Sequence, residues 1–364
     1  MMRLDDREWE PFYVGDLFSV KRPVARNKDD YQEGFVPFVA SGSVNNGVMK
    51  CCQPFEDETL DVGGCITVSP VDGSAFYQPY DFLGRGGAGS SVLMLYRGGL
   101  NLYIGQFIAK MVAHTCSGKY NYGHMGNKDS IKRERIMLPV TDEGTPDYQF
   151  MEDYIRELMG TKKKQYRGYI EKRLSDLCSV PDDQKVDWKS MINSHEWEPF
   201  RIDSIFNILP GKRLVAADST PGDRPFIGAL DNSNGVARFV SDKNESLDKN
   251  VLGVNYNGNG MVIGFYHPYE CIFSDDVKRF HLKDREDDPY VMLFMKSVIL
   301  MQKKKFGYLY KFNADRMAHT NIMLPVTDDG QPDYDFMEEF GRKMMSNKYN
   351  QYLAFLAMSD TIKV

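Results

Sequence analysis

The sequence has no long hydrophobic run, no excess of basic residues and no pair of cysteines in CxxC spacing. Its longest apolar runs, such as residues 291–295 and 298–301, fall far short of the roughly 20 residues that span a membrane. The acidic, polar start MMRLDDREWEPF is unlike a secretory signal. The six cysteines, of which Cys51 and Cys52 are adjacent, indicate free thiols and not a disulfide framework. We therefore expect a soluble protein of the cytoplasm.

Motifs of catalysis are also missing. The sequence contains no GxxxxGK[ST] phosphate loop, no HExxH, no GxSxG and no [DN]PP[FY] tetrapeptide of DNA methyltransferases. The six histidines lack metal-ligand spacing, and His114 with Cys116, two residues apart, fits a loop or surface better than a metal site. A PD…(D/E)xK nuclease interpretation of residues 181–185 would need a strand scaffold that this polar segment lacks. The sequence predicts no catalytic residue and no metal.

The composition nevertheless supports ordinary globular domains. The 364 residues are 42% hydrophobic and 13% aromatic, which suits two domains of usual size, each with its own core. Lys and Arg number 45 against 51 Asp and Glu, giving a net charge of −6. This balance argues against a general binder of polyanions, whose surface would normally be basic.

The most informative feature is a tandem duplication. Residues 136–154, IMLPVTDEGTPDYQFMEDY, match residues 322–340, IMLPVTDDGQPDYDFMEEF, at 14 of 19 positions. The two halves also begin alike, with WEPFYVGDLFSV from Trp9 and WEPFRIDSIFNI from Trp197. PFVASGSVNNGV from Pro37 corresponds to PFIGALDNSNGV from Pro225, and YQPY from Tyr77 to YHPY from Tyr266. These matches keep their order, so each half is one structural unit.

Hydrophobic periodicity predicts an α+β architecture in each half. We expect strands followed by Asn-Gly and Asp-Gly turns at 35–40, 65–68 and 226–228, short helices at 104–113 and 290–301, and strands at 136–140 and 322–326. A long helix follows each half, with Asp147 or Asp333 as its N-cap. The predicted division is a domain over 1–146, a helix over 147–178, a linker over 179–196, a second domain over 197–332 and a second helix over 333–358.

Each predicted long helix carries a broad apolar face. A helix of 30 residues reaches about 45 Å, and its apolar stripe must be buried against something. The simplest arrangement packs the two copies on each other. The candidate residues for helix packing and partner docking are Met151, Ile155, Leu158, Tyr169 and Leu174 in the first helix, and Met337, Phe340, Met344 and Leu356 in the second.

Basic, aromatic and amide side chains gather in loops before each ILPV strand and in the Asn-rich turns. Lys and Arg neutralise phosphates, whereas Asn pairs with adenine edges. The alternative is a solvated loop with tyrosines packed beneath it. The candidate DNA-binding residues are Asn45, Asn46, Arg85, Lys119, Tyr122, Asn127 and Lys128 in the first half, and Arg213, Asn232, Asn234, Lys305, Tyr308, Lys311 and Asn313 in the second.

With these features together, the sequence resembles the specificity (S) subunits of type I restriction–modification systems and the similar subunits of BcgI-like type IIB systems. The signatures are the unit start W-x-x-[FY]-x-[IVL] at Trp9 and Trp197, the aromatic, Gly-containing stretches at 119–127 and 306–313, and I-x-L-P at 136–139 and 322–325. The resemblance covers nearly the whole chain. It implies two target-recognition domains, each followed by a long helix, with the helices packed antiparallel as a coiled coil around a pseudo-two-fold axis.

The resemblance also implies a non-catalytic subunit. Each half would recognise one half-site of a bipartite, asymmetric target in double-stranded DNA. The helices would dock methyltransferase subunits, separate or fused to a nuclease, together with any separate restriction subunit; S-adenosylmethionine and Mg would be bound by those partners. The spacer helices are shorter than those of many type I subunits, and the PVT-D-x-G-x-PDY link is longer than usual; both features favour the type IIB kind. Two alternatives are a protein-interaction scaffold or decoy resembling a specificity subunit, and an enzyme with two lobes.

Overall fold

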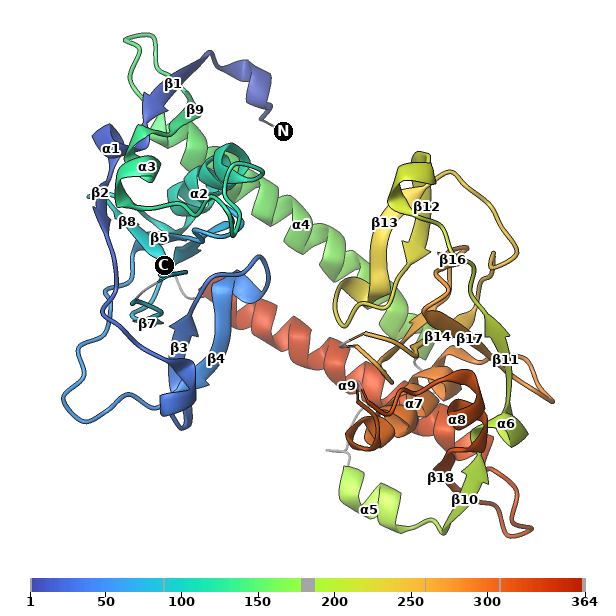
Figure 1. The fold of residues 1–364 in the computed structure, drawn as a ribbon. Coiled ribbons are helices and arrows are strands. Elements are labelled where there is room, and N and C mark those ends of the chain that lie inside the picture. The colour runs from blue at the N-terminus through green and yellow to red at the C-terminus, as the bar shows by residue number, and fades with distance from the viewer. Residues whose placement is uncertain (1, 88, 178–186, 259, 308, 362–364) are drawn as a thin grey trace. The chain divides into compact units, whose positions relative to one another are not determined.

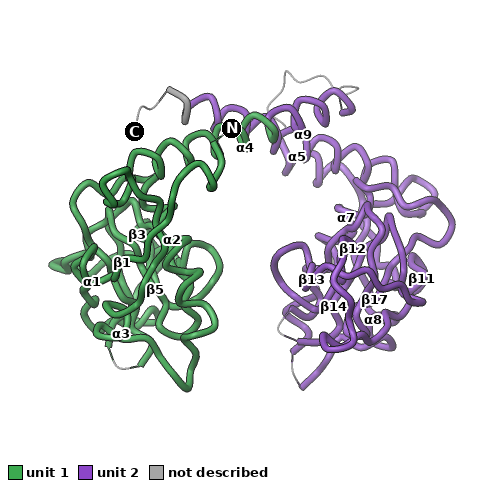
Figure 2. The backbone as a smooth tube through the Cα atoms, turned by 90° about the horizontal axis from the view of Figure 1, so that it is seen from above, with its two compact units in different colours: residues 1–166 green, residues 167–364 purple. Residues whose placement is uncertain are grey.

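The chain folds into two compact units, residues 1–166 and 167–364, each with its own core (Figure 2). The structure is a computed structural model, and it describes residues 2–87, 89–177, 187–258, 260–307 and 309–361. None of the helices in these ranges is long and apolar enough to cross a membrane. Five cysteines lie there as free thiols, four of them buried, whereas Cys178 lies outside the described residues.

Unit 1 contains three β-sheets and several helices (Figure 1). Its sheets have the strand orders β2-β8-β5-β6, β4-β3-β7 and β1-β9. The strands are β1 (Trp9–Tyr13), β2 (Ser19–Lys21), β3 (Glu33–Val39), β4 (Val48–Cys52), β5 (Cys65–Val68), β6 (Ala75–Gln78), β7 (Leu83–Gly84), β8 (Leu93–Tyr96) and β9 (Arg135–Pro139). The helices are α1 (Val14–Leu17), α2 (Leu102–Cys116), α3 (Lys128–Arg133) and the start of α4 (Tyr148–Leu177), with short 3-10 turns η1 (Leu4–Asp6), η2 (Lys28–Asp30) and η3 (Asn45–Gly47).

Unit 2 repeats this topology strand for strand. Its sheets have the orders β11-β17-β14-β15, β13-β12-β16 and β10-β18. The strands are β10 (Trp197–Arg201), β11 (Phe206–Pro210), β12 (Pro221–Ile227), β13 (Val236–Val240), β14 (Val251–Asn255), β15 (Gly264–His267), β16 (Ile272–Phe273), β17 (Val277–Leu282) and β18 (Asn321–Pro325). The helices are α6 (Ile202–Ile205), α7 (Pro289–Leu300), α8 (Ala314–His319) and α9 (Tyr334–Thr361), with η4 (Ala216–Asp218), η5 (Ser233–Gly235) and η6 (Met301–Lys305). The duplication in the sequence is therefore a duplication of one α+β fold.

The tryptophan at the start of each repeat closes its unit. Trp9 pairs with Pro139 across the β1–β9 ladder, and Trp197 pairs with Pro325 in the same register of β10–β18. The Trp9 ring stacks on Phe107 of α2 with centroids 5.9 Å apart. The first and last strands of each repeat are thus joined, and the long helix starts directly after this ladder.

The largest buried cluster of unit 1 surrounds α2, which packs on the four-stranded sheet and on β9. Asn101 caps α2 by accepting from the backbone N–H groups of Tyr103 and Ile104, and the helix then lays its apolar face across β5 and β6. In unit 2, Asp288 caps α7 in the same way, with Pro289 at the first helical position. The residues that fill the two cores include Ile66, Leu95, Ile108 and Ile136 in unit 1 and Leu252, Phe280, Met295 and Ile322 in unit 2.

The long helices begin at the aspartates that the sequence indicates. Asp147 Oδ1 accepts from the backbone N–H of Phe150 at 2.9 Å, and Asp333 Oδ1 accepts from Phe336 at 2.9 Å. Both carboxylates also lie where the helix dipole favours a negative charge. The two copies therefore use the same cap.

The apolar face of α4 is divided between two environments, which the sequence does not reveal. Met151 is fully buried in the core of unit 1, and Ile155 packs against the same core. Ile170 and Leu177, at the other end of α4, belong to unit 2 and pack with Tyr349 of α9. In that cluster Leu174 is half-buried. Each end of the stripe is thus buried by a different partner, because the first turns of the helix stay on the domain that precedes them.

The helix α9 follows the same rule in unit 2. Met337 and Phe340 pack into the core of unit 2, where Gly341 passes close to Tyr290 of α7. A Cβ on Gly341 would lie 2.8 Å from the Tyr290 carbonyl oxygen, so a larger residue would push the two helices apart. Further along α9, Met344 is half-buried and Leu356 is buried.

Part of the segment expected to be a linker is helical. Residues 178–186, which include the proposed nuclease-like sequence 181–185, lie outside the described residues. Trp188–Asn193 form the short helix α5, capped by Asp187. The Trp188 ring meets Phe340 edge-on at 5.3 Å, and Met191 packs against the core of unit 2. The second half of this segment therefore belongs to the packed part of unit 2.

Candidate nucleic-acid interface

Loops from separate parts of unit 1 are joined by hydrogen bonds into one surface. Ser74 Oγ donates to the Gly42 carbonyl at 2.9 Å, which connects the loop after β5 to the loop after β3. Ser41 Oγ donates to the Ser90 carbonyl at 3.0 Å, which adds the Gly-rich loop after β7. These contacts hold the Asn-rich turn and the Gly-rich loop side by side.

The aromatic, basic loop after α2 belongs to the same surface. The backbone N–H of Gly126 donates to the Pro70 carbonyl at 2.8 Å. Gly73, with φ of 72°, lies against the end of α2, where a Cβ would sit 2.4 Å from the backbone of Cys116. Only glycine satisfies both the left-handed backbone and this close approach. The candidate residues of the first half, Asn45 to Lys128, are thus carried by loops in mutual contact.

Unit 2 assembles the corresponding loops with different contacts. Asn255 Nδ2 donates to the Leu230 carbonyl at 2.7 Å, joining the loop after β14 to the loop after β12. The backbone N–H of Tyr256 donates to the Asp276 carbonyl at 3.1 Å, and the N–H of Phe312 lies 3.4 Å from Met261 Sδ. The loop before α8 is therefore part of this surface too.

The Asn-rich turns have an unusual backbone in both units. Asn45 and Asn46 have φ of 50° and 57°, and Asn234 has φ of 53°. The Asn46 side chain donates to the Tyr77 carbonyl and to Gln78, whereas Asn234 Nδ2 donates to Tyr269 Oη at 2.8 Å. Asn46 and Asn234 therefore hold the turns in place. Asn45 lies exposed beside them, as does Asn232, whose Nδ2 lies 3.2 Å from Asp231 Oδ1.

Asn127 and Asn313 are helix caps. The Asn127 side-chain oxygen accepts from the backbone N–H groups of Asp129 and Ser130 at 2.9 Å each, which starts α3. Asn313 starts α8 in the same way, by accepting from Arg316 at 3.0 Å. With the amide oxygen used inside the protein, neither side chain has its full set of groups left for a bidentate contact with adenine.

The candidate cations differ in how firmly they are held. Lys119 Nζ pairs with Glu134 at 2.6 Å, and Arg85 donates to the carbonyl and hydroxyl of Ser90. Arg213 lies 3.8 Å from Asp275, with both side chains well exposed. Lys128 and Lys305 are exposed. Exposed ion pairs are weak, so these cations remain open to exchange with phosphate.

One aromatic candidate, Tyr122, lies at the tip of a short hairpin that has an equivalent in unit 2. Residues 121–124 and 307–310 each close by a pair of backbone hydrogen bonds. Tyr122 is 82% exposed at the first tip, and its counterpart Tyr308 lies outside the described residues. Lys311 is half-buried beside the second tip, and its carbonyl accepts from Arg316 at 2.8 Å.

The aromatic, basic stretch over 306–316 contains a stacked platform beside the second hairpin, an arrangement that the sequence does not reveal. The Tyr310 ring stacks on Phe306 with centroids 5.6 Å apart and planes inclined by 7°. The guanidinium carbon of Arg316 lies 3.9 Å from the Tyr310 centroid on the ring face. Stacked aromatic and guanidinium planes are typical of nucleic-acid-binding surfaces. The sequence signal was the spacing of Phe306, Tyr310 and Arg316 around the hairpin, which is visible only once the turn is known.

Each unit also has an acidic groove, apart from the loops that carry the candidate basic residues. In unit 1 a groove of about 680 Å³ at the start of α4 is bordered by six carboxylates and one arginine. In unit 2 the corresponding groove of about 620 Å³ is bordered by Glu196, Glu198, Asp328 and Asp333. Such surfaces repel phosphate, so a nucleic acid would approach each unit away from the start of its long helix. The net charge of the chain is thus an average over unlike surfaces.

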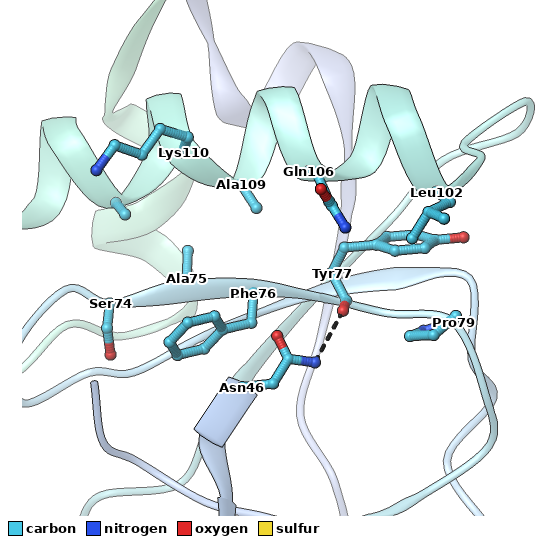
Figure 3. Close-up of a pocket in the computed structure, with 11 residues that line it drawn as sticks. Asn46, Ser74, Ala75, Phe76, Tyr77, Pro79, Leu102, Gln106, Ala109 and Lys110 are labelled. Atoms are coloured by element: carbon cyan, nitrogen blue, oxygen red, sulfur yellow. Dashed lines mark hydrogen bonds between the residues drawn. The ribbon is translucent and has the colours of Figure 1, made fainter. Parts of the chain in front are cut away.

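A third groove, of about 500 Å³, lies in unit 1 beside the Asn-rich turn (Figure 3). Gln106 and Lys110 border it from α2, and Asn46 faces them across β6. Ala109 leaves the groove open. The residue of unit 2 that corresponds to Ala109 is Lys296, whose ammonium lies 4.9 Å from the centroid of Phe265. The two halves therefore differ beside their Asn-rich turns.

Within the described residues, no three or more His, Cys, Asp or Glu side chains form a group that could hold a metal ion. His114 is not itself buried, and Cys116 is buried in the core of unit 1. Arg279, which is buried, is held in an ion pair. Arg279 Nη1 lies 2.7 Å from Asp248.

Comparison with known proteins assigns both units to one family of domains. The family model described as type I restriction modification DNA specificity domain matches residues 6–166 and 194–352. A curated relative, the type II restriction enzyme specificity subunit S.BcgI of Heyndrickxia coagulans, is 36% identical over 342 residues, which cover 93% of this chain and 94% of the relative.

Solved structures of low sequence identity also align along the chain. The S subunit of a type I restriction-modification system from M. genitalium is 14% identical, with a TM-score of 0.45, over 99% of this chain and 96% of that one. The HsdS subunit from Thermoanaerobacter tengcongensis is 10% identical, with a TM-score of 0.32, over 98% of this chain and 92% of that one.

Proposed function

The chain belongs to the family of type I restriction modification DNA specificity domain proteins, and from this we propose how its two halves divide the recognition of DNA. The chain is a specificity subunit of a restriction–modification system and is not an enzyme by itself. Each half recognises one half-site of a bipartite target in double-stranded DNA. The observation that carries this proposal is the repetition of one fold with two different sets of joined loops.

Differences between the loops support an asymmetric target. The two Asn-rich turns have the same backbone, yet the residues that lead into and begin them are Ser43, Val44 and Asn45 in one unit and Asp231, Asn232 and Ser233 in the other. Side chains that contact base edges determine the sequence recognised, whereas phosphate contacts fix the register. Two halves with unlike loops on a shared scaffold will therefore select unlike half-sites.

We propose that recognition domains over 1–146 and 197–332 are held apart by the spacer helices over 147–178 and 333–358. The burial of α4 at both of its ends supports this, because a helix anchored on a domain at one end and on α9 at the other acts as a spacer. A rigid spacer gives the half-sites a fixed, non-specific gap. We also propose that the two spacer helices pack on each other as an antiparallel coiled coil.

The helices are also the proposed docking surface for methyltransferase subunits in the cytoplasm. The name of the curated relative, a specificity subunit of a type II restriction enzyme, favours a partner that combines methyltransferase and nuclease in one chain. Those partners would carry S-adenosylmethionine and Mg, and would flip the adenine that is methylated. The acidic surface of this chain then requires its partners to supply much of the contact with phosphate.

Selection from randomised duplex DNA tests the proposal. The complex of this chain with its methyltransferase partner should enrich a single interrupted motif with two unlike halves. The chain alone should transfer no methyl group and cut no DNA. Enrichment of no motif would support the scaffold or decoy alternative, and turnover by the chain alone would support the two-lobed enzyme.

Docking through the helices has its own test. Replacing Leu158 and Tyr169 together with Asp should abolish co-purification with the methyltransferase, because charges would replace the apolar surface between the two packed ends of α4. A matched variant, Lys164→Asp, introduces the same charge at an exposed position more than about 100° around the helix from both residues and should still assemble. A complex that assembles equally well with the double variant would locate the partner surface on the globular units.

A further inference from the structure

The Asn-rich turns of the two units share an unfavourable backbone conformation, in which consecutive residues have positive φ. In the turn of unit 1, residues 44–47, Asn45, Asn46 and Gly47 all have positive φ, of 50°, 57° and 74°. In the turn of unit 2, residues 232–235, Ser233 and Asn234 have φ of 49° and 53°. Asparagine adopts this conformation more readily than other non-glycine residues, but two or three such residues in succession, with a serine among them in unit 2, remain a restricted state of the backbone. Each turn therefore needs contacts that hold it.

In unit 1 a buried glutamine holds the turn. Gln78, on β6, is 4% exposed, and its Nε2 donates to the Asn46 carbonyl and to Thr67 Oγ1, both at 2.9 Å. Asn46 Nδ2 donates back to Gln78 Oε1 at 3.3 Å and to the Tyr77 carbonyl at 3.2 Å. This reciprocal pair fixes the turn to the sheet. Figure 3 shows Asn46 directed at the Tyr77 carbonyl.

In unit 2 the same place holds a histidine. His267 pairs with Val251 across the β14–β15 ladder, as Gln78 pairs with Cys65 in unit 1. The His267 ring is fully buried, and its Nδ1 lies 3.3 Å from Tyr269 Oη. Tyr269 Oη in turn accepts from Asn234 Nδ2 at 2.8 Å. Gln78 bonds the turn of unit 1 directly, whereas His267 reaches the turn of unit 2 through the hydroxyl of Tyr269. We call Gln78 and the His267–Tyr269 pair the tethers of the two turns.

The residues around Gln78 and His267 also differ between the two units. Thr67, which bonds Gln78, corresponds in the ladder to Gly253, where an added Cβ would lie 3.2 Å from His267 Nε2. Tyr269 corresponds to Tyr80, which is 77% exposed. Burial, and then the charge of Lys296, lowers the pKa of His267 to about 4, so the ring that meets Tyr269 Oη is neutral at neutral pH.

We propose that Gln78 and the His267–Tyr269 pair are positioning residues that set where each turn meets DNA, each acting on one half-site only. This inference rests on the proposed function. The turns carry the residues that differ between the halves, namely Val44 and Asn45 against Asn232 and Ser233. A turn released from its tether would lose its strained backbone and present those residues loosely. Discrimination at one half-site would then fall, while the other half-site would be recognised as before.

Two variants and a matched control test the inference in the assembled complex with the methyltransferase. Methylation rates are measured on the selected target and on duplexes with one changed base pair in either half. Gln78→Leu should lower discrimination about tenfold in one half-site, the scale of a lost base contact, and leave the other unchanged. Tyr269→Phe, which removes a single hydroxyl at a partly exposed site, should lower it in the opposite half-site. Tyr80→Phe, the equivalent change in unit 1, should alter neither.

The outcomes separate this inference from the function on which it rests. A wild-type complex that selects no interrupted motif would overturn both. A wild-type complex that selects such a motif, with variants that change neither half or both halves equally, would overturn only the inference, since the tethers would then act on folding alone. A half-specific loss in opposite halves for the two variants supports it.

Discussion

An ion network in unit 2 makes the stability of that unit depend on pH in a specific way. His281 on β17 lies between two carboxylates, with Nδ1 2.5 Å from Asp287 and Nε2 3.0 Å from Asp248. Asp248 also pairs with Arg279 at 2.7 Å. These hydrogen bonds, first that of Asp248 and then that of Asp287, raise the pKa of His281 to about 9 against burial. The ring is 24% exposed, so solvent screens the network only in part.

The sign and size of the effect follow from linkage. The pKa of His281 rises from 6.5 in the unfolded chain to about 9 in the folded one, which corresponds to about 3 kcal/mol. Because the folded pKa is the higher one, this stabilisation is fully present below pH 6.5. It is lost as the pH rises through 9. Replacing His281 with Gln should therefore destabilise unit 2 by about 3 kcal/mol at pH 6 and by much less at pH 10.

Urea unfolding followed by tryptophan fluorescence measures this directly. Of the three tryptophans, Trp9 lies in unit 1 and Trp188 and Trp197 in unit 2, so a Trp9→Phe background reports on unit 2. His281→Gln is compared with this background at pH 6 and pH 10. The control is His319→Gln in the same unit, whose exposed pair with Asp315 contributes about 1 kcal/mol at most. An equal loss at pH 6 and pH 10 for His281→Gln would refute the reasoning.

Three further predictions concern the recognition surface and the helices. Lys128→Ala should weaken DNA binding by the complex at all sequences and reduce the slope of log K against log salt by about 1, if Lys128 meets a phosphate; an unchanged slope would locate the phosphate contacts elsewhere. Asn127→Ala should destabilise unit 1 by about 1 kcal/mol through the lost helix cap, measured by thermal melting, with no new base preference; a changed base preference without destabilisation would restore it as a base contact. Ile170→Ala should cost about 3 kcal/mol by opening the buried cluster beside Tyr349, whereas exposed Glu171→Ala should cost under about 0.5 kcal/mol; equal costs would contradict the packing described for α4.

Much of the fold is readable from the sequence because the duplication doubles every signal. The ladder of Trp9 with Pro139 has the register of Trp197 with Pro325, and both long helices start at the Asp of the PDY sequence. The comparisons confirm the prediction of a specificity subunit with two repeated domains of mixed helix and sheet.

The details of the site are less readable, for physical reasons. A polar side chain looks the same in sequence whether it faces solvent or closes a helix, so the sequence predicts Asn127 and Asn313 as DNA contacts without revealing that their oxygens cap α3 and α8. An apolar stripe shows a helix but not its neighbours, so Met151 was expected at a helix interface and lies in the core of unit 1. Buried tethers such as Gln78 require the pairing of strands, which sequence spacing does not give.

Replacing one recognition domain by the other tests the central claim most directly. In such a chain residues 9–146 stand in place of residues 197–332, and the spacer helices remain unchanged. The complex with the methyltransferase is then allowed to select from randomised duplex DNA. If each half recognises its own half-site, the motif will contain two copies of the half-site of unit 1, separated by a gap. A motif that keeps the second wild-type half-site would contradict the account.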